Sequence, residues 1–294
     1  MFSRRHPYLF FLLVLSGICA SVMVAVSIVV FLGLRSIGVG VFSEESAGRI
    51  GVVEVSGYLM DSIDTVSAIK RFREDDSIRA IVLRVDSPGG AVGPAQEIYR
   101  EIVKTTESKP VVASLGTTAA SGGYYVASAA TQIVANPGTI TGSIGVIMSY
   151  ANFEELIRKF GLVPVVIKSG EHKDMGSPMR KMLPEERAIL QGLSDQIHRQ
   201  FIQAVADGRK LSEKEVRKLA DGRIFSGETA QEKGLVDMLG NFEDAVDVAA
   251  VLGNITGKPE LVHSEDKKIR WLKKLTETAA AAILGADRTP LLRY

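Results

Sequence analysis

Ser121 is the residue whose sequence surroundings best suit covalent chemistry. It lies in the run GTTAASGGYY, residues 116–125, between an apolar stretch typical of a buried strand and a run of small residues typical of an interior helix. Two glycines follow the serine directly and let backbone and substrate approach its hydroxyl closely. The plain alternative is that Ser121 caps the following helix, because serine is a favoured N-cap residue.

A serine nucleophile needs a base within hydrogen-bond reach and donors for the oxyanion that forms. The Gly122 amide is predicted to begin a helix, where N–H groups point outward and the dipole favours negative charge. A second amide is expected from the Gly89-Gly90 turn, because both turns follow parallel strands at one edge of a sheet. For the base, His172 and Lys173 are adjacent in one loop, and spacing alone does not choose between them. A lysine serves only as its neutral amine.

The elements that must position these residues follow from the apolar periodicity of residues 50–255. Strands are predicted at 50–55, 80–85, 110–115, 132–135, 140–147 and 163–167. Helices are predicted around 66–72 and at 94–106, 126–130, 153–160, 184–208, 212–219, 229–233 and 241–252. Strands that alternate with helices predict an α/β fold with a largely parallel sheet.

Residues 8–34 contain no charged side chain, and 27 residues make a helix of about 40 Å, enough to span a bilayer. Arg4 and Arg5 precede this stretch, so the positive-inside rule places the amino end in the cytoplasm. A cleaved signal peptide would have a shorter apolar core of about 7–15 residues. The expected division is a cytoplasmic end (1–7), a transmembrane signal anchor (8–34), a linker (35–49), a catalytic domain (50–255) and a C-terminal tail (256–294).

The composition excludes several classes of protein. The chain has 35 basic and 34 acidic residues, which gives no reason to expect a nucleic-acid partner. Its single cysteine, Cys19, excludes an intramolecular disulfide and a cysteine-rich metal site. The four histidines show no metal-ligand spacing. We therefore expect neither a metal nor a cofactor.

Four motifs occur together and in order. They are DSPGG at 86–90, ASGGYY at 120–125, TGSIGV at 141–146, and a longer motif at 168–178 that reads KSG, two residues, KD, two residues, SP. With these motifs, the chain resembles the signal peptide peptidases of the SppA type in their short, single-repeat form. The resemblance covers roughly residues 50–255. It implies a Clp-protease/crotonase-like fold of repeated β-β-α units.

The resemblance also implies a role for each motif. Ser121 matches the nucleophile, Lys173 matches the general base, and Ser143 matches the hydroxyl that orients the lysine amine. The oxyanion and substrate-binding groups match Gly89, Gly90 and Gly122. The implied activity is that of a membrane-anchored serine endopeptidase with a Ser-Lys dyad, which degrades residual signal peptides after their release from precursors.

The same resemblance implies partners and a location. Longer relatives carry two repeats, with lysine and serine in different halves, so a single-repeat chain is expected to form a homo-oligomeric ring with shared sites. The anchor would place the enzyme in the inner or plasma membrane, with its catalytic domain on the extracytoplasmic side. Three alternatives remain open: a related anchored Ser-Lys protease that cuts a specific membrane protein, a crotonase-type acyl-CoA hydratase or isomerase, and an anchored scaffold with an inactive site.

Overall fold

The computed structural model describes residues 7–36 and 48–264, and the chain divides into two units, Met1–Ser46 and Ala47–Tyr294. In the first unit, helix α2 runs over Pro7–Ser36, where the sequence predicts a helix. Within the part of the chain that the structure describes, no helix is both long enough and apolar enough to cross a membrane. Nearly all of the expected cytoplasmic end, most of the linker and most of the C-terminal tail lie outside the described residues.

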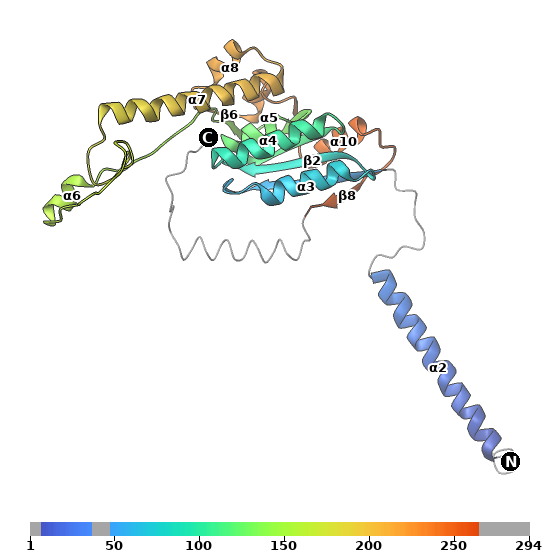
Figure 1. Cartoon of the computed structure of the whole chain (residues 1–294). Coiled ribbons are helices and arrows are strands. Elements are labelled where there is room, and N and C mark those ends of the chain that lie inside the picture. The colour runs from blue at the N-terminus through green and yellow to red at the C-terminus, as the bar shows by residue number, and fades with distance from the viewer. Residues whose placement is uncertain (1–6, 37–47, 265–294) are drawn as a thin grey trace. The chain divides into compact units, whose positions relative to one another are not determined.

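Strands and helices alternate through the second unit (Figure 1). In chain order they are β1 (Arg49–Ser56), α3 (Ile63–Glu74), β2 (Ile78–Ser87), α4 (Val92–Thr106), β3 (Val111–Ala120), α5 (Gly122–Ser128), β4 (Gln132–Ala135), β5 (Ile140–Gly142), α6 (Glu154–Lys159), α7 (Pro184–Arg209), α8 (Glu213–Leu219), β6 (Ile224–Ser226), α9 (Gly227–Glu232), β7 (Met238–Leu239), α10 (Phe242–Leu252) and β8 (Glu260–His263).

The strands form one sheet in the order β6-β5-β3-β2-β1-β8, and β4 and β7 continue it on a branch from β3. Its pairs are parallel except for β5 with β6. Strand β3 pairs with β4 along its first half and with β5 along its last three residues, where Ala120 lies opposite Gly142. The α/β fold with a largely parallel sheet is confirmed, and the carboxyl ends of β2, β3 and β5 come together.

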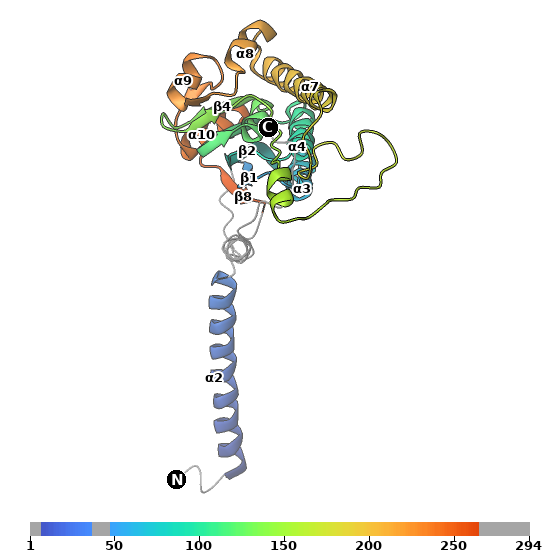
Figure 2. The ribbon, with the colours of Figure 1, turned by 90° about the vertical axis from the view of Figure 1, so that its left-hand side faces the viewer.

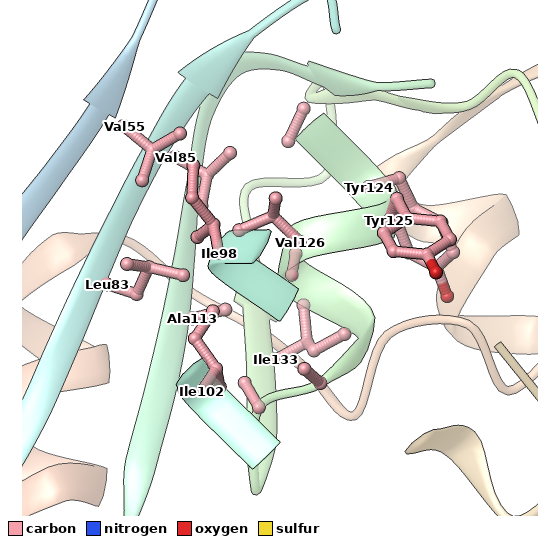
Figure 3. Packing of buried hydrophobic residues seen from close by; sticks show 14 of the residues in the cluster. Val55, Leu83, Val85, Ile98, Ile102, Ala113, Tyr124, Tyr125, Val126 and Ile133 are labelled. Atoms are coloured by element: carbon pink, nitrogen blue, oxygen red, sulfur yellow. The ribbon is translucent and has the colours of Figure 1, made fainter. Parts of the chain in front are cut away.

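Apolar side chains cover both faces of the sheet, because alternate residues of each strand point to opposite sides. On one face Leu83 packs with Ile98 of α4 and Val126 of α5 (Figure 3). On the other face Val82 packs with Ala249 of α10. Full burial of one such large apolar side chain stabilises the fold by about 1.5–3 kcal/mol. Strands β2 and β3 therefore form a rigid base under the turns that follow them.

The strand predicted at 163–167 is wrong. These residues are irregular, and Val163, Val165 and Ile167 are 82%, 83% and 97% exposed. A run of β-branched residues becomes a strand only where a neighbouring strand accepts its hydrogen bonds, and no described strand pairs with this segment. The strand predicted at 140–147 ends early, at Gly142, because Ser143 has φ +53°, outside the extended region.

Residues 148–183, which we call the lysine arm, connect the region after β5 to helix α7 and contain the short helix α6. In both ribbon views the arm runs away from the sheet, beyond the first turn of α7 (Figures 1 and 2). The first and last parts of the arm are joined by hydrogen bonds. Phe153 N–H donates to the Pro178 carbonyl at 2.7 Å, and Lys181 N–H donates to Glu154 at 3.0 Å. The arm is thus held by contacts within itself.

Candidate active site

Ser121 lies between β3 and α5 in a strained backbone conformation, with φ +55° and ψ −124°. A positive φ at a residue other than glycine costs on the order of 1–3 kcal/mol and persists only where the surrounding structure imposes it. Here the Ser121 N–H donates to the Gly142 carbonyl at 2.8 Å, and the Ser121 carbonyl accepts from Tyr125 N–H at 2.9 Å. The side chain makes no capping bond to α5. Ser121 is thus the N-cap residue of α5 by position, but its side chain does not cap the helix.

The Ser121 hydroxyl is buried, and its Oγ has no hydrogen-bond partner among the described residues. It faces a cavity of about 300 Å³. The other residues that line this cavity come from the segment after β5, from α7 and from the segment before β6: Ser143, Gly145, Val146, Ile147, Gln191, Ser194, Asp195, His198, Ala220, Asp221 and Gly222. A buried hydroxyl with free hydrogen-bonding capacity beside a cavity can act on a ligand bound there.

Glycines allow the turn after β2 to touch residues 120–123, which we call the serine corner. Gly89 has φ +102°, and a Cβ added to it would lie 2.7 Å from Gly122 N and 3.1 Å from Ser121 Oγ. A Cβ on Gly123 would lie 2.5 Å from the Ser87 carbonyl oxygen. Contacts this close exclude any side chain at either position. The sequence motif therefore has glycines where the two turns meet.

The turn after β2 contains the amides of Gly89 and Gly90. The Gly89 N–H already has a hydrogen-bond partner, because it donates to Ser87 Oγ at 3.1 Å. The turn is held further by Leu59, whose N–H donates to the Gly89 carbonyl at 3.0 Å and whose carbonyl accepts from Ala91 N–H at 2.8 Å. The nitrogen of Gly90 lies 3.3 Å from the place where a Gly122 side chain would begin. All three predicted glycines thus lie beside the serine.

Ser143 lies next to the serine corner for a reason of strand register. Ala120 and Gly142 are paired across β3 and β5, so Ser121 and Ser143 are the next residue on each strand. Ser143 has φ +53°, and its N–H donates to the Arg223 carbonyl at 2.8 Å. Both serines line the same cavity. The structure therefore brings these two predicted site residues together.

Lys173 and His172 lie elsewhere, in the lysine arm. Lys173 is exposed, its backbone N–H donates to the Gly170 carbonyl at 3.3 Å, and neither residue is among those that line the serine cavity. The arm runs away from the sheet in both ribbon views (Figures 1 and 2). A single chain thus supplies the serine and its amides without bringing the lysine to them.

Helix α7 adds polar residues to the cavity that the motifs do not single out. Gln191, Asp195 and His198 follow one another at helical spacing and face the serine cavity, and His198 Nε2 is buried without a partner among the described residues. Across the cavity, hydrogen bonds from Arg223 lower the pKa of Asp221 to about 2, so this side chain is a carboxylate at neutral pH. The sequence signal that could have identified these residues is their recurrence on one face of the amphipathic helix α7.

Comparison with known proteins shows the family that the chain resembles. The family described as "Peptidase family S49" matches residues 104–256, and the family described as "Clp protease" matches residues 61–139. A Synechocystis sp. protein named "Putative protease slr0021" is 45% identical over 77% of this chain and 83% of its own length. An Enterococcus faecium protein named "Putative signal peptide peptidase SppA" is 40% identical over 76% of this chain and 66% of its own length. "Protease 4" of Salmonella typhi is 36% identical over 72% of this chain and 36% of its own length.

The fold, the serine corner and these matches define a serine-type peptidase with a Clp-protease-like domain. The peptidase-family match covers more than half of the 294 residues and includes Ser121, Ser143 and Lys173. The chain belongs to peptidase family S49, the family of the SppA peptidases.

Proposed function

We propose that this protein is a membrane-anchored serine endopeptidase that uses a Ser121–Lys173 dyad to degrade signal peptides left after their release from precursors. The observation that carries the proposal is the serine corner: a buried Ser121 hydroxyl, without a hydrogen-bond partner in the part of the chain that the structure describes, on a strained turn beside the amides of Gly90 and Gly122. Family membership makes the chain a serine-type peptidase, and the E. faecium relative is named for signal peptides.

In the proposed reaction, Ser121 Oγ attacks the peptide carbonyl while the neutral amine of Lys173 takes the hydroxyl proton. The carbonyl oxygen becomes an oxyanion that accepts hydrogen bonds from Gly90 and Gly122 N–H. The lysine then gives its proton to the leaving amine as the C–N bond breaks. Water, deprotonated by the lysine, attacks the acyl-enzyme and releases the second product with the serine restored. Ser143 lies beside Ser121 and would form a hydrogen bond with the lysine amine, which would orient the amine.

We propose further that the lysine comes from a neighbouring subunit in a ring. The serine cavity holds Ser121 and Ser143, and none of the described residues that line it is a lysine. The arm that carries Lys173 extends from the domain with exposed apolar side chains. A head-to-tail contact that closes on itself completes each serine cavity with the arm of the next chain.

The anchor and the substrate are connected by physical chemistry. The uncharged residues 8–34 would hold the enzyme in the inner or plasma membrane with its N-terminus cytoplasmic and its catalytic domain extracytoplasmic. Signal peptides contain an apolar core of about 7–15 residues and therefore concentrate in the bilayer. An anchored peptidase meets such substrates at high local concentration.

A fluorophosphonate probe tests the nucleophile. We expect labelling of one serine in the wild type, mapped to Ser121 by mass spectrometry, and no labelling of Ser121→Ala. The wild type should also cleave synthetic signal peptides incorporated into vesicles, and Ser121→Ala should not. Labelling with selective cleavage of one folded membrane protein would favour the related anchored protease, and hydration of an enoyl-CoA without labelling would favour the acyl-CoA enzyme. Neither labelling nor turnover would favour the scaffold.

A further inference from the structure

The residue next to the proposed base is held by an unusual set of bonds. Asp174 directly follows Lys173, and its carboxylate accepts two parallel bonds from Arg180, from Nε at 2.8 Å and from Nη2 at 2.9 Å. Lys168 Nζ donates to the same carboxylate at 2.6 Å. Two-bond contacts between arginine and carboxylate fix direction as well as distance. The backbone beside Lys173 is thus held by a planar, directional contact.

Arg180 joins this loop to the first turn of α7. Its Nη1 and Nη2 donate to the two oxygens of Glu186 at 2.9 and 2.5 Å, and Nη1 also donates to the Lys181 carbonyl at 3.1 Å. Every nitrogen of the guanidinium is therefore bonded. Glu186 is only 1% exposed, and it accepts from Leu183 N–H at 2.9 Å at the start of the helix. We call Asp174, Arg180 and Glu186 the Arg180 clamp.

The charges of the clamp remain in place over a wide pH range. Hydrogen bonds from Arg180 lower the pKa of Glu186 to about 2, and bonds from Arg180 and then Lys168 hold the pKa of Asp174 well below its usual range. The clamp spans the loop of Lys173 and the helix whose later turns line the serine cavity with Gln191 and His198. Through α7, the position of Lys173 is tied to the wall of its own chain's cavity.

We propose that Arg180 is a positioning residue for the base: it fixes the direction in which the Lys173 loop leaves α7, so that the amine reaches a serine in the productive geometry. This inference rests on the proposed function of Lys173. A base that is misplaced by about 1 Å can lose on the order of 100-fold in rate. Arg180 itself touches neither serine and acts only through Asp174.

The test compares the steady-state kinetics of Arg180→Ala, Arg180→Lys and Asp174→Asn in the full-length protein. We expect kcat for Arg180→Ala to fall by about 100-fold with KM changed less than threefold, because substrate still binds at an intact serine corner. Arg180→Lys should recover little, since an ammonium group cannot bridge two carboxylates in a plane. Added guanidinium should restore at least a tenth of the kcat lost by Arg180→Ala and nothing to Lys173→Ala. Asp174→Asn, which keeps the side chain's size, should lower kcat in the same way.

Arg187→Ala is the matched control, because Arg187 is an exposed arginine that directly follows Glu186 in the first turn of α7. It should keep kcat within twofold of the wild type. Thermal unfolding and sedimentation must show that each variant is folded and assembled as the wild type is. A wild-type kcat for Arg180→Ala, or a loss that follows disassembly alone and is not rescued by guanidinium, would overturn the positioning role. Near-normal turnover of Lys173→Ala would instead overturn the proposed base, so the two failures are distinct.

Discussion

The serine corner and the lysine arm carry the two halves of one proposed reaction and are built in opposite ways. The serine corner rests on a buried sheet, and it touches the turn after β2 so closely that Gly89 and Gly123 admit no side chain. The arm has no buried apolar core of its own: Val165 and Ile167 are 83% and 97% exposed, and its order comes from hydrogen bonds and the Arg180 clamp.

This contrast indicates which part is complete in one chain. A nucleophile on a strained turn needs a rigid base, which apolar burial in the same chain provides. The arm has exposed apolar side chains and is fixed to α7 by the Arg180 clamp. It is therefore suited to contact another surface, since exposed apolar patches mark interaction sites. Variants that change one region at a time therefore separate the two roles.

The largest effect is expected from removing either half of the dyad. Ser121→Ala and Lys173→Ala should each lose on the order of 10⁴-fold or more in turnover, because each removes a whole chemical role. His172→Ala should retain activity, since it leaves the neutral lysine amine in place as proton acceptor. Wild-type activity should rise as the pH becomes alkaline, because a general base accepts a proton only in its deprotonated form. Peptide cleavage measured from about pH 6 to pH 10 checks all four statements. If His172→Ala is inactive while Lys173→Ala turns over normally, the base is misassigned.

A smaller loss is expected from closing the contact between the two turns. Gly89→Ala places a Cβ 2.7 Å from Gly122 N at φ +102°, so the amides near Ser121 must move apart. Loss of one oxyanion donor costs about 100- to 1000-fold in kcat, and we expect a loss in this range. Gly93→Ala is the control and should be fully active, because a Cβ at Gly93 would meet no described atom within 4 Å beyond its chain neighbours and the backbone of its own helix. Equal activity of the two variants would show that the close contact is not needed.

Charging the arm should disturb assembly and leave the fold of the single chain intact. Val165→Asp adds a charge to a side chain that is 83% exposed in one chain, so the thermal unfolding midpoint should change little. If the arm is buried against a neighbour, self-association should weaken at least about tenfold, because an unpaired charge is costly to bury. Sedimentation velocity measures this. Val251→Asp, at a valine of α10 that is 75% exposed, should associate as the wild type does. Matching behaviour of both variants would place the contact elsewhere.

The smallest effect is expected from acid. The folded-state pKa values of Asp174 and Glu186 are lowered, so their stabilisation is complete above the unfolded values of about 4 and is lost as pH falls through the folded values. Amide exchange of the arm, corrected for intrinsic rates, should accelerate between about pH 5 and pH 2 before that of strand β2. Unchanged protection of the arm at pH 2 would mean that the clamp does not order it.

The sequence could predict the serine corner because its signals are local. Gly122 and Gly123 after a buried strand, and the Ser87-to-Gly90 turn after another, specify two turns at the same edge of a parallel sheet. Register then places Ser143 beside Ser121, which no local signal specifies. The prediction of a strand at 163–167 was wrong, because residues with high β propensity form a strand only where another strand pairs with them. The short strands β6 and β7, of three and two residues, have too few residues for a period to show.

We expect Ser121 and Lys173 of different chains to form one site, and mixing two inactive variants tests this directly. Ser121→Ala chains are combined with Lys173→Ala chains under conditions in which subunits exchange, and mixed assemblies are verified by mass. In a ring with shared sites and equal random mixing, about one site in four receives both an intact serine and an intact lysine. We therefore predict recovery of about a quarter of wild-type peptide cleavage per site. Complete inactivity of a verified mixed assembly would contradict the shared site, because a site formed within one chain would never contain both residues.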